Sequence, residues 1–384
     1  MLRFWIAHNA HQTGCALVWI VFVPAAVYQC LAIFAGVRHI VTRVRARSHN
    51  EDFRPGVSVL KPLRGIDPNT YAAFVSQIQQ KYPEFEVLFG AREEDDPAAI
   101  EVRRLVGEFP DAPMRLIIGG EPTPNGKVGV LIALAEQAKY PVWVVNDSDI
   151  RVGPDYLENV VSPLSDTSVG VVTCLYRAYA HTVAAAWESF GIATDFMPST
   201  LVAQALGVRE FGLGSTLAFR AEDLKRAGGF TAIADYLADD YQLAKRITSL
   251  GKRALLSTYT VETSLGDATW SGAWQHQLRW ARTIRVSKGA GYAGLPITHA
   301  ALWAAVALAS GAWPAAVILW ALRSISALIT SGFVLESRFT ATFCWLAPVW
   351  DLYAFCIWMA SYAGRTVRWR DRVVQVGPDG RIRN

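Results

Sequence analysis

VWVVNDSDIRV, at residues 142–152, joins a run of four apolar residues to a polar loop. The apolar run is rich in β-branched side chains, which is typical of a buried parallel strand, and the Asn-Asp-Ser-Asp that follows is typical of a turn. Open α/β sheets bind their ligands at the carboxyl ends of such strands. Asp147 and Asp149 are therefore candidate ligands for Mg²⁺ or Mn²⁺ shared with a substrate's phosphates, although a solvated turn would use the same residues.

Three further predicted strands precede this stretch, and a helical segment follows each of them. The strands are expected at 57–61, 86–90 and 114–118, and the helices at 67–80, 97–109 and 127–138. This alternation predicts βαβ units, that is, a parallel sheet with helices on both faces. The pattern is that of a nucleotide-binding sheet, but no GxGxxG follows the first strand, so a dinucleotide fingerprint is absent from the sequence.

The pattern is looser after residue 152, where a second acidic pair appears. Asp239 and Asp240 lie in the segment 231–247, which has the spacing of an amphipathic helix. Carboxylates in a first helical turn are ordinary partners of the helix dipole, and they are also suited to proton abstraction. The other elements expected in this region are a strand at 169–174, helical character at 181–206 and a short strand within 212–220.

Apolar segments flank this polar region. Hydrophobic residues make up 52% of the 384 residues, and the segments 15–37, 299–322 and 339–364 are long enough to cross a bilayer core of roughly 30 Å. The shorter 324–335 predicts a re-entrant or interfacial piece, with a third C-terminal span as the alternative. The positive-inside rule places the N-terminus outside and the region after Val37 and the tail in the cytoplasm. The arginines on which this rests are Arg38, Arg43, Arg45, Arg47, Arg54, Arg365, Arg368, Arg370 and Arg372.

An acidic residue within an apolar segment, a tryptophan-rich segment, the cysteines and the net charge indicate further what kind of protein this is. Asp351, inside a predicted span, is a functional candidate by default, and pairing with another helix is the alternative. Residues 269–289 mix tryptophan with arginine and lysine, which predicts an interfacial helix. The five cysteines show neither metal-binding nor disulfide spacing, and the net charge of +4 indicates no nucleic-acid partner.

Four polar motifs follow one another in a fixed order: KPLRG from Lys61, EEDDP from Glu93, DSD from Asp147 and DDY from Asp239, with an Arg-Trp pair after them. In these motifs and their surroundings, such as VSVLKPLRGIDPN and EVLFGAREEDDPA, the chain resembles the ceramide glucosyltransferase family of inverting GT-A glycosyltransferases. The Arg-rich tail is similar to the bacterial branch associated with hopanoid lipids. The resemblance implies an α/β GT-A fold, a mixed sheet with helices on both faces, flanked by N- and C-terminal transmembrane helices.

The resemblance also implies roles for single residues. Asp240 matches the catalytic base, and Asp147 and Asp149 match the metal and diphosphate site. Glu93 matches the acidic residue that contacts the nucleobase, with Asp95 and Asp96 as alternatives beside it. The other implied donor-side residues are Lys61, Lys127, Arg279 and Trp280, and the implied acceptor-side residues are Gly214, Ser215, Asp239 and His276, the last standing where the broader group has Gln or Arg.

The implied activity is transfer of glucose or N-acetylglucosamine from a UDP-sugar to the hydroxyl of a membrane lipid, ceramide or a hopanoid polyol, with Mg²⁺ or Mn²⁺. Residues 1–37 would form an N-terminal membrane segment, 38–290 a cytoplasmic catalytic domain, 291–364 a C-terminal membrane region and 365–384 a basic tail, in a bacterial inner membrane. One alternative is a processive polysaccharide synthase, which needs more spans than the sequence offers. Another is a non-catalytic membrane-anchored protein that binds a nucleotide or lipid, which would not need Asp240.

Overall fold

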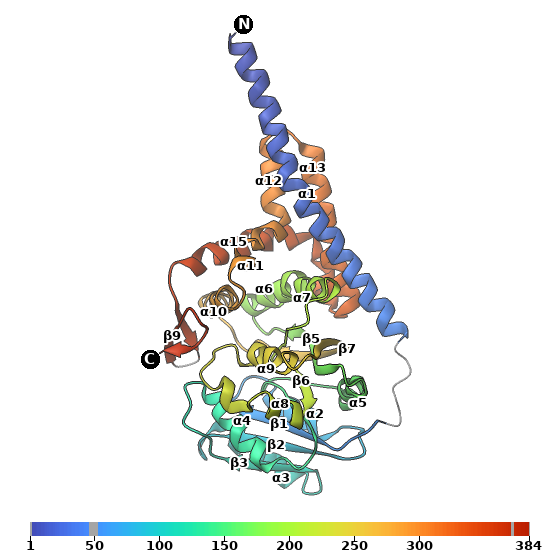
Figure 1. Ribbon diagram of the computed structural model, residues 1–384, viewed down its shortest axis with the longest axis vertical. Helices are drawn as coiled ribbons and strands as arrows, with labels where there is room; N and C mark the ends of the chain where they lie inside the picture. The colour runs from blue at the N-terminus through green and yellow to red at the C-terminus, as the bar shows by residue number, and fades with distance from the viewer. Residues whose placement is uncertain (1, 46–52, 370–371, 384) are drawn as a thin grey trace. The chain divides into compact units, whose positions relative to one another are not determined.

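The computed structural model describes residues 2–45, 53–369 and 372–383 (Figure 1); Arg47 and Arg370 of the basic flanks lie outside the described residues. The chain folds as two compact units. The helical unit comprises Met1–Ile40, Phe190–Ala205 and Ser271–Val373, and the sheet unit comprises Val41–Ser189, Leu206–Trp270 and Val374–Asn384. This division differs from the expected one, because a change from polar to apolar sequence does not reveal that 190–205 joins the helical unit or that the last residues join the sheet unit.

A mixed seven-stranded sheet, in the order β3-β2-β1-β4-β6-β5-β7, forms the centre of the sheet unit. β6 is antiparallel to both neighbours, and the other neighbouring pairs are parallel. The expected α/β sheet is thus confirmed, but β7 was missed because its half-buried, polar-rich sequence lacks an apolar run. The strands are β1 (Val57–Leu63), β2 (Phe85–Ala91), β3 (Met114–Ile118), β4 (Val142–Val145), β5 (Val169–Tyr179), β6 (Leu217–Arg220) and β7 (Arg253–Ser264), and the C-terminal β9 (Arg372–Val376) and β10 (Ile382–Arg383) pair antiparallel.

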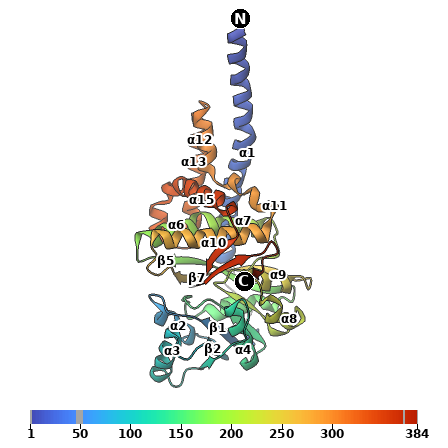
Figure 2. The same cartoon turned by 90° about the vertical axis from the view of Figure 1, so that its left-hand side faces the viewer.

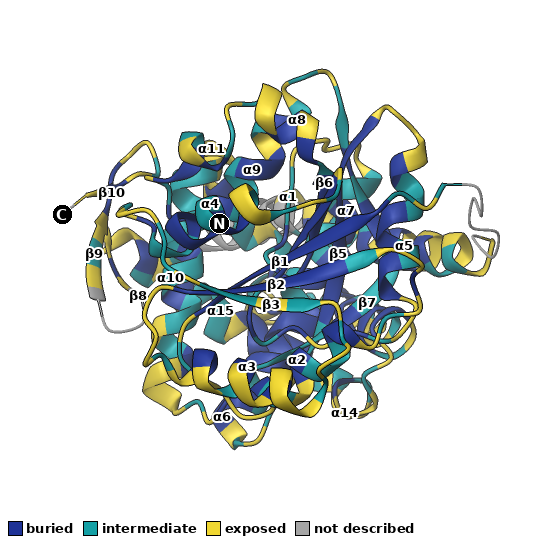
Figure 3. Ribbon diagram, turned by 90° about the horizontal axis from the view of Figure 1, so that it is seen from below, coloured by how far each residue is buried: buried dark blue, intermediate teal, exposed yellow. Residues whose placement is uncertain are grey.

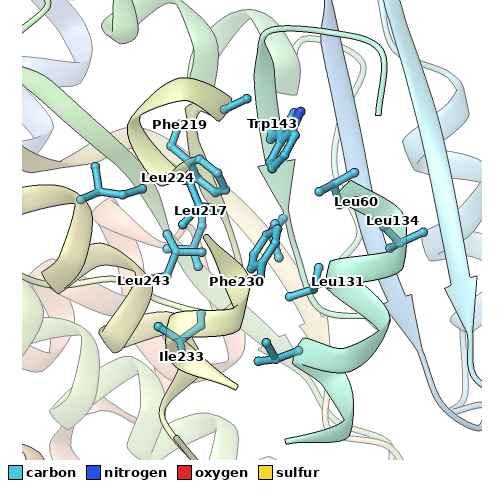
Figure 4. Packing of buried hydrophobic residues seen from close by; sticks show 14 of the residues in the cluster. Leu60, Leu131, Leu134, Trp143, Leu217, Phe219, Leu224, Phe230, Ile233 and Leu243 are labelled. Atoms are coloured by element: carbon cyan, nitrogen blue, oxygen red, sulfur yellow. The ribbon is translucent and has the colours of Figure 1, made fainter. Parts of the chain in front are cut away.

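Helices cover both faces of the sheet. On one face Leu131 and Leu134 pack into a core with Trp143, whose ring stacks on Phe230 with centroids 6.1 Å apart (Figure 4). The central strands are buried, whereas β3 at the edge is only partly buried (Figure 3). Burial of this apolar surface, at about 25 cal/mol per Å², is what fixes the alternating elements in place. The helices are α2 (Thr70–Ile78), α3 (Pro97–Glu108), α4 (Gly126–Gln137), α5 (Tyr156–Val161), η1 (Ser162–Ser165), α8 (Ala221–Arg226), η3 (Phe230–Ile233) and α9 (Asp239–Thr248).

The register of β4 and β6 positions the opening stretch. Val145, the last residue of β4, lies opposite Leu217, the first residue of β6. Because the two strands are antiparallel, the loop that leaves β4 and the loop that enters β6 meet at the same edge of the sheet. The amide of Asp147 accordingly donates to the carbonyl of Gly214 at 3.1 Å.

The helical unit contains two helices that are long and apolar enough to cross a membrane, over Phe22–Arg45 and Trp313–Val334. The first belongs to the long α1, which covers the expected span at 15–37. The elements of this unit are α1 (Leu2–Arg45), η2 (Ile192–Phe196), α7 (Met197–Ala205), α11 (Ala290–Ala293), η4 (Leu295–Thr298), α12 (Ala300–Ala309), α13 (Trp313–Leu328), η5 (Ile329–Val334), α14 (Arg338–Thr342), η6 (Cys344–Leu346), α15 (Ala347–Tyr362) and β8 (Thr366–Trp369). α6 (Val183–Gly191) and α10 (Trp270–Lys288) each begin in the sheet unit and continue into this one.

Two of the predicted spans are not single helices. The expected helix over 299–322 is wrong, because the chain turns at Gly311, which has a φ of 78°, and α12 and α13 form a hairpin (Figure 1). Figure 2 shows the same helices from the side. α13 runs on into the π-helical η5, so 324–335 continues a helix and is not a separate re-entrant piece. The expected helix over 339–364 is divided among α14, η6 and α15.

Asp351 pairs with another helix, which was one of its two interpretations. Its Oδ1 accepts hydrogen bonds from Nε and Nη2 of Arg323 at 2.9 and 2.8 Å, and its Oδ2 accepts one from the amide of Ala301 at 3.1 Å. Nη1 of Arg323 donates to the carbonyl of Thr194 at 2.6 Å. The pair therefore joins α12, α13, α15 and the π-helical η2 inside the helical unit.

Candidate active site

The loop after β4 rests on the ammonium group of Lys61. This side chain is fully buried and donates to Asn146 Oδ1 at 2.9 Å, to the carbonyl of Asp147 at 2.8 Å and to the carbonyl of Ile150 at 3.4 Å. Burial lowers the pKa of Lys61 to about 7, although the charges of Asp149 and Asp147 oppose the shift. Lys61 was expected on the donor side of the site, and the structure places it beneath the loop that carries the two aspartates.

A polar layer continues from Lys61 under the sheet edge. The amide group of Asn146 donates to Gln77 Oε1 at 3.3 Å and to the hydroxyl of Tyr156 at 3.4 Å, and that hydroxyl lies 3.0 Å from Thr216 Oγ1. All of these residues are fully buried. Buried polar groups that are mutually hydrogen-bonded fix a single geometry, so the loop that bears Asp147 is held from below.

Lys127 joins the loop after β4 to the start of α9. Its Nζ lies 2.8 Å from Asp147 Oδ1 and 2.9 Å from Asp239 Oδ2. α4 presents this lysine in its first turn because Asn125 caps the helix, accepting at Oδ1 from the amides of Lys127 and Val128. The Asn125 side-chain amide also donates to Asp239 Oδ1 at 3.3 Å.

The charges around Lys127 outweigh the effect of burial. Burial by itself lowers the pKa of this lysine, but the carboxylates of Asp147, Asp239 and Asp240 together hold it above its ordinary value. The lysine therefore stays protonated as a fixed cation between the two acidic motifs.

Asp240 is held by backbone amides. Its Oδ1 accepts from the amide of Tyr241 at 2.7 Å, and its Oδ2 accepts from the amide of Gly214 at 3.1 Å. Burial, followed by the neighbouring charge of Asp239, raises the pKa of Asp240 to about 6, and Lys127 opposes the shift. A carboxylate with a pKa near 6 is a stronger base than an ordinary aspartate and is still mostly ionised at neutral pH.

Asp149 lies on the β7 side of the same loop. The hydroxyl of Thr263 in β7 donates to its Oδ2. Burial and then the charge of Asp147 raise the pKa of Asp149, although the Thr263 hydroxyl opposes the shift. Among the described residues, no three or more His, Cys, Asp or Glu side chains lie together in a way that could hold a metal ion.

Two of the predicted acceptor-side residues lie in the loop before β6. Gly214 leaves no room for a side chain, because a Cβ there would lie 2.7 Å from Asp147 Oδ2. The hydroxyl of the buried Ser215 donates to the carbonyl of Cys174 at 2.9 Å. Gly214 thus contacts both acidic motifs, whereas the Ser215 hydroxyl fastens its loop to β5.

The acidic residues after β2 separate into two kinds. Asp96 caps α3, accepting from the amide of Ala98 at 2.8 Å, and it also accepts from the amide of Gly65 at 2.9 Å. Glu93 and Asp95 are exposed. The carboxylate of Asp96 therefore joins the β1 and β2 loops, and Glu93 and Asp95 are the ones open to solvent.

The predicted residues His276, Arg279 and Trp280 lie on α10, in the helical unit. The ring of Trp280 is 4.7 Å from that of His276 and 5.2 Å from that of Phe196, measured between centroids. The residues gathered in the sheet unit are thus Lys61, Gly214, Lys127, Asp147, Asp149, Asp239 and Asp240.

Asn125 and Thr263 contact site residues and were missed in the sequence. The signal for Asn125 was present, because Asn-Gly-Lys at a helix start is an N-cap pattern. Thr263 had no such signal, since it lies on the strand β7 that was itself missed.

The chain is similar to known proteins in both sequence and structure. The model of glycosyl transferase family 21 matches residues 17–382. Ceramide glucosyltransferase 1 of Caenorhabditis elegans is 29% identical over 276 residues, which cover 70% of this chain and 57% of that protein. Ceramide glucosyltransferase 3 of the same organism is 26% identical over 244 residues, 62% of this chain and 53% of that protein. The chain thus spans about half the length of the curated relatives it matches.

A solved structure supports the fold. The mannosyltransferase PcManGT from Pyrobaculum calidifontis, in complex with GDP-Man and Mn²⁺, matches with a TM-score of 0.52 and 21% identity, over 89% of this chain and 99% of that one. This likeness concerns the fold alone and confirms the expected GT-A architecture. The family model covers most of the sequence, and with it the resemblance drawn from the four polar motifs is confirmed: the chain belongs to glycosyl transferase family 21.

Proposed function

We propose that the protein is a membrane-bound inverting glycosyltransferase that moves a hexose from a UDP-sugar to the hydroxyl of a membrane lipid. One observation carries the proposal. Lys127 forms ion pairs with both Asp147 and Asp239, so the motif expected to hold the donor and the motif expected to carry the base belong to one site. The names of the family 21 relatives, ceramide glucosyltransferases, support glucose as the sugar and a sphingolipid as the acceptor.

Asp240 is the proposed base. The acceptor oxygen forms a bond to the anomeric carbon while the bond from that carbon to the diphosphate oxygen breaks, and UDP leaves with the electron pair. The proton of the acceptor hydroxyl moves to Asp240, whose neighbour Asp239 is already paired with Lys127. Such a single displacement inverts the anomeric centre, and general-base assistance is typically worth roughly 10²–10⁴ in rate.

Asp147 and Asp149 fit a divalent cation in the chemistry of their donors. Both offer hard carboxylate oxygens, and burial followed by the charge of Asp147 raises the pKa of Asp149, so a bound cation would relieve the cost of ionising it. Two carboxylates are few for a protein-only site, but Mg²⁺ and Mn²⁺ complete their coordination with substrate phosphates and water. When bound, the ion would neutralise charge on the departing diphosphate.

Lys127 and Gly214 have positioning roles in this scheme. Lys127 fixes the carboxylates of Asp147 and Asp239, and the amide of Gly214 fixes Asp240. Lys61 supports the loop of Asp147 from beneath. Because the same few residues preorganise the donor site and the base, little rearrangement is needed when the substrates bind.

The helical unit supports a location at the membrane. The apolar helix over Phe22–Arg45 precedes the sheet unit, and a basic flank at its C-terminal end favours a cytoplasmic sheet unit. A lipid acceptor and a soluble nucleotide-sugar donor would then meet at the cytoplasmic surface of the membrane.

The test is transfer from labelled UDP-glucose or UDP-N-acetylglucosamine to ceramide or a hopanoid polyol, with Mg²⁺ or Mn²⁺ and the purified full chain. We expect a labelled glycolipid with wild-type protein and a rate lower by about 10²–10⁴ with Asp240→Asn. Asp111→Asn, a change at an exposed position on α3's C-terminal side, is the matched control and should keep full activity. Full transfer by Asp240→Asn, or no glycolipid with any pairing, would overturn the proposal.

Gly214 offers a second test that leaves every charged group in place. Gly214→Ala forces a methyl group against Asp147 Oδ2, whereas Gly107→Ala on α3 meets nothing within 4 Å. We expect Gly214→Ala to lower the transfer rate by about 10-fold or more through displacement of the Asp147 carboxylate. Gly107→Ala should leave the rate unchanged.

A further inference from the structure

The last residues of the chain return to the sheet unit and pair with the segment that leads into α9. β9 and β10 form a hairpin in which Ile382 lies opposite Val376 and Arg383 opposite Gln375. The free edge of β10 pairs antiparallel with residues 235–237, through an isolated bridge between Tyr236 and Arg381. One bridged residue pair is thereby added to the hairpin, shortly before the acidic pair.

Two backbone hydrogen bonds and one side chain make this contact. The amide of Ile382 donates to the carbonyl of Asp235 at 2.7 Å, and the amide of Leu237 donates to the carbonyl of Gly380 at 3.3 Å. The guanidinium carbon of Arg381 lies 5.4 Å from the centroid of the Tyr236 ring. Ile382 and Val376 are buried, at 8% and 2% exposed, so the hairpin is anchored by apolar side chains as well.

The other side of the same segment contacts the N-terminus of α4. The side-chain amide of Asn125 donates to the carbonyl of Tyr236 at 2.8 Å, and the backbone amide of Asn125 donates to the carbonyl of Ala234 at 2.9 Å. Residues 234–237 therefore lie between the C-terminal hairpin and the residue that caps the helix of Lys127. They lead through Ala238 into Asp239, the first residue of α9.

We propose that the C-terminal hairpin, residues 374–383, is a positioning element for the acidic pair Asp239–Asp240. It clamps residues 235–237 against Asn125 and so fixes where α9 begins. The inference rests on the proposed function in taking Asp240 as the base. It assigns a function to residues 374–383, which lie outside the four sequence motifs.

Two variants and a control test the clamp, each made in the full-length protein. One variant ends the chain after Val376, which removes β10. The other is Ile382→Pro, which removes the N–H that donates to Asp235 and leaves the rest of the tail in place. Val373→Ala, at an exposed position of β9 just before residues 374–383, is the control.

A clamp and a purely structural tail predict different kinetics. For the clamp we expect both variants to lower kcat by roughly 10–100-fold while KM for the UDP-sugar stays within about twofold, since a displaced base affects the chemical step. Val373→Ala should match wild type. An unchanged kcat in the truncated chain, or a rise in donor KM as large as the loss in kcat, would overturn the proposal.

Amide hydrogen exchange gives a readout that does not depend on transfer. In the truncated chain the amide of Leu237, which loses its acceptor Gly380, should exchange faster together with its neighbours up to Gln242, while β1 and β2 keep their protection. Unchanged exchange at 235–242 would overturn the clamp whatever the activity. Absence of transfer by wild-type protein would instead count against the proposed function and leave the exchange result to decide this inference.

Discussion

Two clusters of buried charge in this molecule are built on opposite principles. In the helical unit the cation Arg323 bonds to one carboxylate, that of Asp351. Both side chains are buried, at 3% and 0% exposed, and both also bond to the backbone. In the sheet unit Lys127 bonds to two carboxylates, and a third, Asp240, lies close enough to affect its pKa. Counted by the groups that each cation bonds to directly, the first cluster is balanced in charge and the second has more carboxylates than cations.

The difference indicates what each cluster is for. A balanced, fully hydrogen-bonded pair fixes how helices pack, and removing one partner leaves an uncompensated buried charge. Burial, followed by the charge of Asp239, raises the pKa of Asp240, so its ionised form is unfavourable for folding and persists where a substrate, proton or cation uses it. Asp351 and Asp240 were both candidates in the sequence, and only their surroundings separate them.

The largest expected effect is on the balanced pair. Asp351→Asn leaves the guanidinium of Arg323 buried without its counter-ion, which should destabilise the fold by about 3–5 kcal/mol. Thermal unfolding of the detergent-solubilised protein measures this loss. The double variant Arg323→Met with Asp351→Leu should recover most of the stability, because it removes both charges. A double variant no more stable than the single one would contradict the view of an isolated pair.

The unbalanced cluster should respond in activity. Lys127→Met releases Asp147 and Asp239 from their shared cation, and we expect the transfer rate to fall by about 10²-fold because donor and base sites lose their common anchor. The measurement is kcat/KM for the UDP-sugar. Lys139→Met, on the loop after α4, lies outside the cluster and serves as the control. If Lys127→Met lowers the stability as much as Asp351→Asn does and leaves the rate unchanged, Lys127 stabilises the fold in the way that Arg323 does and does not serve the reaction.

The same contrast explains what the sequence could predict. The strand at 142–145 was found because buried strands are continuous apolar runs, and the acidic motifs were found because they follow strands or begin helices. Partners far apart in sequence leave no such trace. Arg323 looked like the end of an apolar segment because its counter-ion lies 28 residues later, on another helix.

Half-buried elements were the other kind of structure that the sequence did not predict. β7 carries Thr263 and mixes polar with apolar residues along its 12 positions, because only part of it faces the core. Its pairing with β5 depends on tertiary contacts that propensity does not encode. The turn at Gly311 was missed for a similar reason, since alanine-rich sequence on both sides reads as one continuous helix.

A smaller effect on stability is expected for Asp240→Asn, with the opposite sign to that of Asp351→Asn. Because the pKa of Asp240 is raised in the folded protein, its ionised form is less favourable there than in the unfolded chain. Asp240→Asn should therefore stabilise the fold at neutral pH by less than about 1 kcal/mol, because the NH2 group of the new side chain cannot accept one of the two backbone N–H bonds that the Asp240 carboxylate accepts. Thermal unfolding of Asp240→Asn and Asp351→Asn side by side gives the comparison directly. Destabilisation by both variants would remove the distinction between the two clusters.

The smallest effect is a displacement of the pH profile. Asp240 accepts a proton only when ionised, so kcat should fall about tenfold per pH unit below a pKa of about 6 and level off above it. Asp239→Asn removes the charge that, after burial, raises this pKa, and Lys127 remains to lower it. The acid limb of the Asp239→Asn profile should therefore lie at lower pH than that of wild type. A limb displaced to higher pH, or one that does not move, would mean that the carboxylate titrating in kcat is not the neighbour of Asp239, and the assignment of Asp240 as the base would fall with it.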